Sequence, residues 1–222
     1  MGGGVKSQIL TVMFLDLANY TRATSELSQH QLNLLHETFD NLVLPTIADF
    51  SGNVVKKIGD AFLVTFDSPS VAVECSKELQ NDFAQFRKEN KTAPIHIRIA
   101  LNLGEVLLRN GDVYGTAVNT AARIEGITKA DHIVMGESVL SAMNGNAMPT
   151  IFIGEKKLKG LNRPIRLYKV KTKEDIIIAS RKKRERQIEK FKRKVFKTVK
   201  IFLAFVLFFL LAFIVWFVVF YF

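Results

Sequence analysis

The segment Ser51–Phe66, SGNVVKKIGDAFLVTF, carries residues whose types and spacing suit the binding of a charged ligand. Two runs of β-branched and aromatic residues, Val54–Ile58 and Ala61–Phe66, flank a Gly-Asp pair, a pattern typical of a β-hairpin. The turn would hold the carboxylate of Asp60 rigidly enough to bind a divalent cation, and Lys56 lies near enough to bind a polar ligand. Gly-Asp turns are also common on protein surfaces, so a solvated hairpin is the alternative interpretation.

A second acidic residue, Asp16, lies at the end of a near-continuous apolar run, Ile9–Leu17. Such a run predicts a central strand buried on both faces, where a carboxylate is costly without a partner. In a split βαβ topology this strand is a neighbour of the hairpin, which brings Asp16 and Asp60 to one place. Paired carboxylates suit two-metal phosphoryl chemistry. Residues 17–27 predict a turn into a helix whose free N–H groups suit phosphate oxygens.

The rest of the chain up to about residue 170 predicts alternating helices and strands. Apolar residues at three- and four-residue steps indicate helices, and the alternation in Ile95–Leu101 indicates a half-buried strand. Pro45 is expected to kink or restart the first helix. Helices are expected at 29–50, from 69, at 116–127 and at 138–143, and further strands at 104–108, 132–135, 150–154 and 165–170. The order βαββαβ predicts an α+β fold with a ferredoxin-like, palm-like core and extra C-terminal elements.

The net charge of +10 is concentrated in one segment. Eleven Lys or Arg and two Glu lie between Arg181 and Lys200, which gives this run a charge of +9 and leaves the rest of the chain near neutral. A basic surface facing a nucleic-acid groove is therefore not expected, and no nucleic-acid partner is predicted. The single cysteine, Cys75, excludes an internal disulfide and is expected to be a small buried residue.

The last segment, 201–222, contains twenty-two residues without a charge, Gly or Pro. A helix of this length spans about 33 Å, enough for a bilayer core of about 30 Å, so a single transmembrane helix is predicted. The basic run before it places the preceding residues in the cytoplasm by the positive-inside rule, and it suits anionic lipid headgroups. We therefore expect a single-pass membrane protein with a globular domain at 1–172, a basic helical juxtamembrane linker at 173–200 and the span at 201–222.

Four motifs, in this order, make the chain resemble a class III nucleotidyl cyclase catalytic domain from about Ile9 to Val170. FLDLANYT resembles the first metal motif of that family, and VKKIGDAF resembles its second metal motif with the base-reading lysine. IRIALNLGEV followed by GDVYGTAVNTAARIE resembles the most diagnostic stretch of the family. LKGLNRPIRLYKV resembles its closing strand with a phosphate-binding lysine. Tyr20 stands where the family usually has Phe.

The resemblance implies a metal site and a nucleotide site. Asp16 and Asp60 would bind two Mg²⁺ or Mn²⁺ ions, and the backbone carbonyl of Leu17 would complete one coordination shell. Lys56 and Asp112 would read the adenine edge, because a lysine donates to N1 and an aspartate accepts from the 6-amino group. That polarity fits ATP and not GTP.

The resemblance also implies the reaction, which is attack of the ribose 3′-OH on the α-phosphate of ATP, giving 3′,5′-cyclic AMP and pyrophosphate. Asn119 would orient the ribose, Arg123 would stabilise charge on the transferring phosphate, and Lys159 would hold the terminal phosphates. Catalysis would be mainly electrostatic and positional. From the residues alone, Asp112 could instead be a turn residue and Arg123 a surface ion-pair partner. Lys57 is expected to be a solvated neighbour.

In that family each site lies between two catalytic domains, one supplying the metal-binding acids and the other the base-reading and transition-state residues. This chain carries both sets, so the resemblance implies a homodimer with two equivalent shared sites. The alternatives are a guanylyl cyclase, disfavoured by Lys56 and Asp112, and a non-catalytic nucleotide-sensing module, disfavoured by the complete set of site residues. A diguanylate cyclase would need a Gly-Gly-acid-acid turn, and KKIGDAF has one acid. A polymerase palm would need further subdomains for which the chain has no room.

Overall fold

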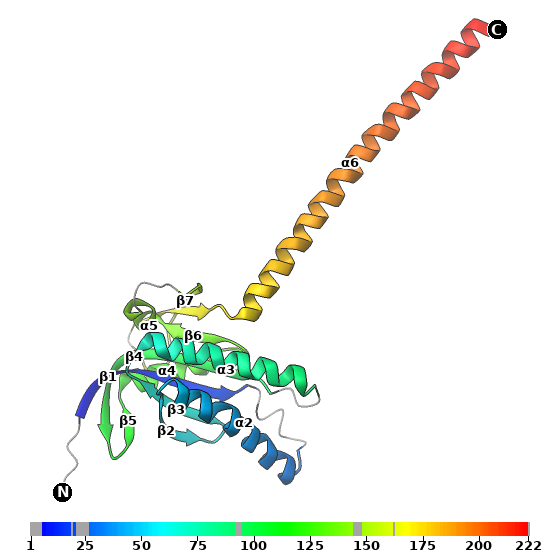
Figure 1. Ribbon diagram of the computed structural model, residues 1–222. Helices are drawn as coiled ribbons and strands as arrows, with labels where there is room; N and C mark the ends of the chain where they lie inside the picture. Colours follow the sequence, from blue (N-terminus) through cyan, green and yellow to red (C-terminus); the bar gives the residue numbers. More distant parts are fainter. Residues whose placement is uncertain are drawn as a thin grey trace. The chain divides into compact units, whose positions relative to one another are not determined.

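The computed structural model describes residues 6–18, 20, 27–91, 95–143, 148–161 and 163–221, without some side chains of the C-terminal helix. The chain separates into two compact units, Met1–Lys173 and Glu174–Phe222. The first contains a β-sheet and the helices that pack on it, and the second consists of the helix α6, Lys173–Tyr221 (Figure 1). Most of the turn and helix expected over residues 17–27 lies outside the described residues.

The first unit contains one eight-stranded sheet. Its strands lie in the order β2-β3-β1-β4-β6-β8-β7, with β5 paired to β4. Its strands are β1 (Lys6–Leu17), β2 (Asn53–Ile58), β3 (Ala61–Phe66), β4 (Ile97–Arg109), β5 (Asp112–Tyr114), β6 (Ile133–Gly136), β7 (Thr150–Lys156) and β8 (Ile165–Val170). β1 is antiparallel to β3 and β4, and β2 is antiparallel to β3. These directions in β2-β3-β1-β4 are those of the predicted ferredoxin-like core, and the α+β fold is confirmed.

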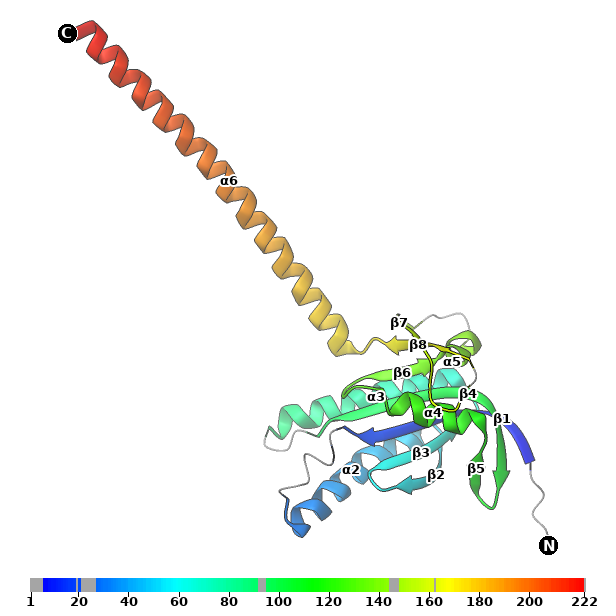
Figure 2. The ribbon, with the colours of Figure 1, turned by 180° about the vertical axis from the view of Figure 1, so that it is seen from behind.

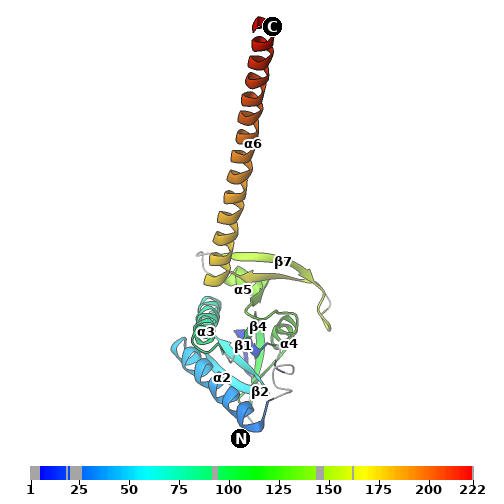
Figure 3. The same cartoon turned by 90° about the vertical axis from the view of Figure 1, so that its right-hand side faces the viewer.

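Helices cover both faces of the sheet (Figure 3). α2 (Gln29–Asp49), α3 (Pro69–Glu89) and α5 (Glu137–Ala142) pack on one face, and α4 (Thr116–Glu125) packs on the other. Side chains of β1 alternate between the two cores, with Met13 and Leu15 toward α2 and α3 and Val12 and Phe14 toward α4. Because side chains alternate along a strand, Asp16 lies on the same face of the sheet as α4.

The helices on the first face begin at serine caps. The Ser28 side chain accepts from the Gln31 amide, and the Ser68 side chain accepts from the Val71 amide. α2 continues through Pro45 to Asp49, so of the two outcomes expected at the proline, a kink or a restart, the restart does not occur. Cys75 is completely buried in α3, as expected, and burial raises the pKa of its thiol to about 12.

The β2–β3 hairpin forms at the expected residues. Gly59 has a φ of +62°, which favours glycine at the first turn position. β4 is one continuous strand where two strands, 95–101 and 104–108, were expected, because its ladder with β1 carries the pairing across the predicted break. β5 was not expected; it runs back along β4 after a turn and forms a projecting hairpin (Figure 2).

The C-terminal helix α6 is continuous from Lys173 to Tyr221. Among the residues that the structure describes, no helix is both long enough and apolar enough to cross a bilayer. The structure does not describe most of the side chains in the predicted membrane span, 201–222. The span therefore stays a prediction.

Candidate active site

Asp16 is a buried carboxylate with one strong cationic partner. Its side chain is only 8% exposed, and Arg98 is its register partner in β4. The Arg98 Nε donates to Asp16 Oδ2 at 2.9 Å, and a second guanidinium nitrogen donates to the same oxygen. Burial raises the pKa of Asp16, the hydrogen bond from Arg98 lowers it, and nearby Glu125 raises it. The charged form of Asp16 is therefore disfavoured by burial, and an additional cation nearby would stabilise it.

Asp60 lies beside Asp16, in the turn of the β2–β3 hairpin. Burial, and after it the negative charge of Asp16, raise the pKa of Asp60. The backbone N–H of Leu17 donates to the carbonyl of Asp60 at 3.4 Å, which ties the end of β1 to the turn. The structure thus brings together the three residues predicted as metal ligands.

Two residues that the sequence analysis did not single out, Arg98 and Glu125, adjoin this acidic pair. Arg98 contacts Glu125 Oε1 at 2.5 Å as well as Asp16. Glu125 is the last residue of α4, and its side chain is 17% exposed. The sequence signal for Arg98 is a charge within the apolar run of β4, but only the strand register shows that it lies opposite Asp16.

Lys56 and Asp112 form an ion pair, although they lie 56 residues apart in the sequence. The Lys56 Nζ is 2.5 Å from Asp112 Oδ2, which links β2 to β5. The β2–β3 register shifts between Val54 and Lys56, and beyond the shift Lys56 pairs with Leu63, a residue of the core beneath α4. Such a bulge redirects a side chain, here toward Asp112. The hydrogen bond from Lys56 lowers the pKa of Asp112.

Lys57 has a different set of partners from Lys56. It forms an ion pair with Asp40 of α2 and lies over the rings of Phe39 and Phe62, at 5.8 and 5.3 Å from their centroids. Lys57 is exposed, as expected, but it also has partners on α2, because adjacent residues of a strand point to opposite faces and α2 covers the second face. Lys57 anchors the hairpin to α2.

Asn119 and Arg123 lie on the exposed side of α4. The buried side of this helix, Ala117, Ala121 and Ile124, packs on the sheet. Among the described residues, no hydrogen bond or ion pair joins Asn119 or Arg123 to Asp16 or Asp60. Both side chains are therefore presented to solvent on α4.

Lys159 lies in the connection between β7 and β8 and is exposed. The preceding Leu158 is buried among Ala100, Ile124 and Leu167, which anchors the connection to the core. Gly160 follows with a φ of +81°, a conformation that favours glycine. The lysine is thus held on an anchored turn with its ammonium group in solvent.

The sequence profile of the adenylate and guanylate cyclase catalytic domain matches residues 5–173. The chain belongs to this family. A serine/threonine-protein kinase, pkn2 of Myxococcus xanthus, is 31% identical to the chain over 169 residues, which are 74% of this chain and 20% of that protein. An adenylate cyclase of Streptomyces griseus is 32% identical over 124 residues, which are 56% of this chain and 30% of that protein. The chain thus covers less than a third of these two relatives.

Solved structures agree with this membership of the cyclase family. An adenylate/guanylate cyclase/hydrolase from Silicibacter pomeroyi is 30% identical and superposes with a TM-score of 0.69, over 75% of this chain and 98% of that one. The fold of the first unit is accordingly that of a cyclase catalytic domain. Whether a cyclase of this family acts on ATP or GTP depends on the residues that bind the base.

The acidic pair of this cyclase domain fits a divalent ion that is shared with a nucleotide. In the described part of the chain, no group of three or more His, Cys, Asp or Glu side chains is suited to holding a metal ion. Mg²⁺ usually takes one or two carboxylates together with substrate phosphates, so Asp16 and Asp60 are a sufficient protein contribution. Burial is the main cause that raises the pKa of both carboxyls, so a bound cation would stabilise their charged forms.

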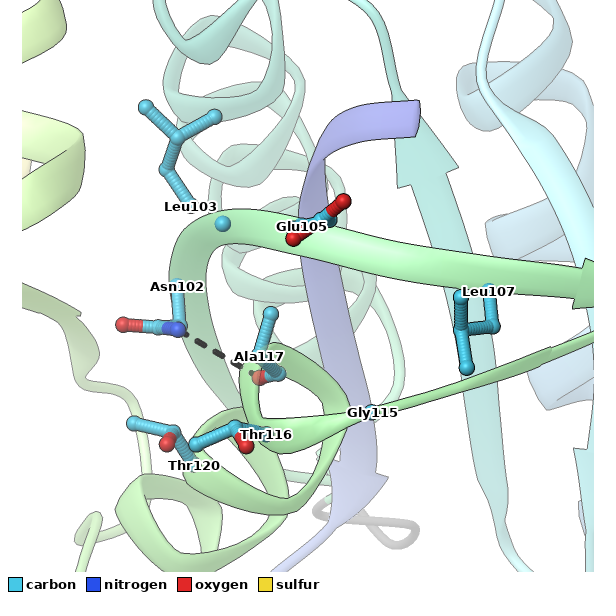
Figure 4. Close-up of a pocket in the computed structure, with 9 residues that line it drawn as sticks. Asn102, Leu103, Glu105, Leu107, Gly115, Thr116, Ala117 and Thr120 are labelled. Atoms are coloured by element: carbon cyan, nitrogen blue, oxygen red, sulfur yellow. Dashed lines mark hydrogen bonds between the residues drawn. The ribbon is translucent and has the colours of Figure 1, made fainter. Parts of the chain in front are cut away.

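A separate pocket of about 440 Å³ lies between the bend of β4 and the first turn of α4 (Figure 4). Its amide residue, Asn102, donates to the carbonyl of Ala117 at 3.3 Å and accepts from the Ser138 hydroxyl at 3.2 Å. The pocket is lined by Asn102, Leu103, Gly104, Glu105, Leu107, Gly115, Thr116, Ala117 and Thr120. None of the predicted site residues of the cyclase domain is among them.

The acidic pair has a consequence for stability, and we expect Asp60→Asn to raise the melting temperature of the metal-free protein. A raised folded-state pKa means that the protonated carboxyl stabilises the fold at low pH, and that this stabilisation is lost as pH rises through the folded-state pKa. The neutral amide removes the repulsion from Asp16 at every pH. A gain of about 1 kcal/mol in the free energy of unfolding would raise the melting temperature by about 2–4 °C.

Calorimetry in EDTA at several pH values between 4 and 8 would test this expectation. The midpoint difference between Asp60→Asn and wild type should widen as pH rises, and cyclase activity should be lost. Asp67→Asn is a matched surface control, since Asp67 is exposed. A melting temperature at pH 8 equal to or below that of wild type would contradict the prediction.

Proposed function

We propose that this cyclase domain converts ATP to 3′,5′-cyclic AMP and pyrophosphate. The observation that carries the proposal is the contact between Lys56 and Asp112, 2.5 Å apart on two different strands. Together they offer one donor and one acceptor, the complement of N1 and the 6-amino group of adenine. Guanine presents the opposite polarity at these positions, so the same pair disfavours GTP.

The proposed chemistry divides between the two groups of residues. Asp16, Asp60 and the carbonyl of Leu17 would hold two Mg²⁺ or Mn²⁺ ions, which supply Lewis-acid stabilisation of the attacking oxygen and of the triphosphate. Asn119 would hold the ribose in position for in-line attack by its 3′-OH. Arg123 would bind the charge that develops on the α-phosphate.

The terminal phosphates of ATP would be bound by Lys159. Its exposure and its place on an anchored turn support a role in binding a ligand that arrives from outside the chain. A lysine acts on phosphate as a point charge, so the interaction does not require a fixed geometry. Pyrophosphate, which keeps both terminal phosphates, would leave from the same lysine.

A homodimer would complete the site. Asn119 and Arg123 face solvent in a single chain, so they are available to the acidic pair of a second copy. Large apolar side chains near the projecting hairpin support such an interface, since Ile9, Leu107 and Tyr114 are 68%, 44% and 49% exposed. Leu107 and Tyr114 are cross-strand partners in β4 and β5, and β1 pairs with the same part of β4. Isologous pairing would create two equivalent sites.

Product analysis tests the proposed activity. The full chain is incubated with ATP or GTP and Mn²⁺, and the products are separated by chromatography. We expect cyclic AMP and pyrophosphate in equal amounts, and much less cyclic GMP. Cyclic GMP as the main product would identify a guanylate cyclase, and nucleotide binding without any cyclic product would identify a nucleotide-sensing module; either result would overturn the proposal.

A membrane anchor is the second part of the proposed organisation. The twenty-two apolar residues at 201–222 support a single transmembrane helix, and the +9 charge at 181–200 supports binding to anionic lipid headgroups and a cytoplasmic catalytic domain. α6 is helical on both sides of residue 200, so the basic run would reach the bilayer without an intervening turn.

Truncation tests this anchor. We expect the full chain to sediment with the membrane fraction and to resist extraction by high salt, because burial of an apolar helix is not screened by ions. A chain ending at Val199 should be extractable by salt, since only the basic run would then hold it to anionic lipid. A full chain that salt releases completely would contradict the proposed span.

A further inference from the structure

Arg98 is shared between the acidic pair and helix α4. Two of its guanidinium nitrogens donate to a single oxygen, Asp16 Oδ2, and one of these nitrogens also contacts Glu125 Oε1 at 2.5 Å. The Arg98 side chain is 28% exposed, so the ion pairs are only partly screened by solvent. Arg98 is therefore a cation held against one of the two carboxylate oxygens that a metal ion could use at Asp16.

A metal ion and Arg98 compete for Asp16. Arg98 occupies one of the two carboxylate oxygens, and its positive charge also repels an incoming divalent ion. Metal binding is easier if Arg98 can move away from Asp16 without losing an ionic partner, because an unpaired half-buried charge is costly. Glu125 provides that partner, since it already contacts the guanidinium.

Glu125 also connects the movement of Arg98 between its two partners to the residues of α4. It is the last residue of the helix, two positions after Arg123 and six after Asn119. When Arg98 leaves Asp16 and pairs with Glu125 alone, the last turn of α4 is tied more firmly to β4. The placement of the helix that carries Asn119 and Arg123 would thus respond to the occupancy of the metal site.

We propose that Glu125 is a positioning residue that receives Arg98 when a metal ion binds at Asp16 and Asp60, and so couples metal binding to the last turn of α4. This inference rests on the proposed metal site. It predicts that Glu125 affects metal affinity only through Arg98, and not through its own negative charge.

A double-mutant cycle on Mn²⁺ binding separates these two effects. Mn²⁺ alone is titrated into the full-length protein and free ion is measured by electron paramagnetic resonance. We expect Glu125→Gln to weaken binding about tenfold in the wild-type background, because Arg98 then stays on Asp16. In the Arg98→Gln background, Glu125→Gln should change the affinity by less than about twofold.

A matched control and a second measurement distinguish positioning from a general structural effect. Glu137→Gln breaks another Glu–Arg pair, the 2.8 Å contact with Arg166, and should leave Mn²⁺ affinity unchanged. Hydrogen exchange follows the amides of the last turn of α4. Mn²⁺ should slow their exchange in wild type, and this slowing should be absent in Glu125→Gln.

Three results would overturn the inference. Glu125→Gln could bind Mn²⁺ as tightly as wild type while Asp60→Asn does not bind it, in which case the metal site stands and Glu125 has no such role. If Glu125→Gln weakened Mn²⁺ binding equally in the wild-type and Arg98→Gln backgrounds, Glu125 would act on the metal ion only through its own negative charge. Mn²⁺ binding that survives Asp60→Asn would refute the proposed metal site itself, and the inference with it.

Discussion

Co-expressed Asp16→Ala and Arg123→Ala chains are expected to recover about a quarter of wild-type cyclase activity, although each variant alone is inactive. Random pairing makes half of the dimers mixed, and each mixed dimer contains one intact site of two. The intact site takes Asp16 from one chain and Arg123 from the other. The exposed position of Arg123 on α4, where a second chain can reach it, is the structural basis of this expectation.

The losses in the single variants should be large. Removing a charge that stabilises phosphoryl transfer costs about 10³-fold or more in turnover, as an arginine finger does. Asp16→Ala also leaves Arg98 without its closest partner, so circular dichroism and a melting curve should accompany the assay. Activity is measured as cyclic AMP formed per mole of total chain.

The control for the complementation pairs Asp16→Ala with Asp60→Ala. Both residues belong to the same half of the site, so every dimer formed by these two variants lacks at least one metal ligand in each site. No activity should return. Recovery in this control, or no recovery with Asp16→Ala and Arg123→Ala despite dimer formation, would contradict sites shared between two chains.

Lys56→Ala is expected to remove most of the preference for ATP over GTP. The loss of a charge-assisted hydrogen bond to adenine N1 should lower kcat/KM for ATP about 10- to 100-fold, with little change for GTP. Asp112 would also lose the ammonium group that holds its pKa low and fixes its position. Selectivity is measured as the ratio of kcat/KM values for the two nucleotides.

Lys57→Ala is the matched control for base selection, since it removes the same charge one residue along β2. Lys57 pairs with Asp40 and packs over two phenylalanine rings on the other face of the sheet, so its loss should lower the melting temperature and leave the ATP-to-GTP ratio unchanged. Equal changes in selectivity for the two variants would refute the assignment of Lys56 to the base.

Local patterns were sufficient to predict most of the elements. The Gly-Asp pair between two runs of β-branched and aromatic residues located both strands of the hairpin, and apolar residues at helical spacing located α3, because these signals depend only on neighbours in the sequence. The break predicted near Gly104 was wrong because pairing with β1 outweighs the local weakness of a glycine. The β5 strand was missed for the same reason, as three residues carry little signal without their partner strand.

The identities of Asp16, Asp60, Lys56 and Asp112 as candidates could be inferred from motifs, whereas their contacts depend on strand order and register. The split βαβ topology predicts that β1 lies beside the hairpin, but only the tertiary structure gives its register with β4, which places Arg98 opposite Asp16. It alone reveals Glu125 as the second partner of that arginine. It also separates Lys56 from Lys57, because a bulge and the packing of α2 decide which of two adjacent lysines meets Asp112. The sequence gives the chemical type of each side chain, whereas strand order and register in the sheet decide which residues distant in the chain come into contact.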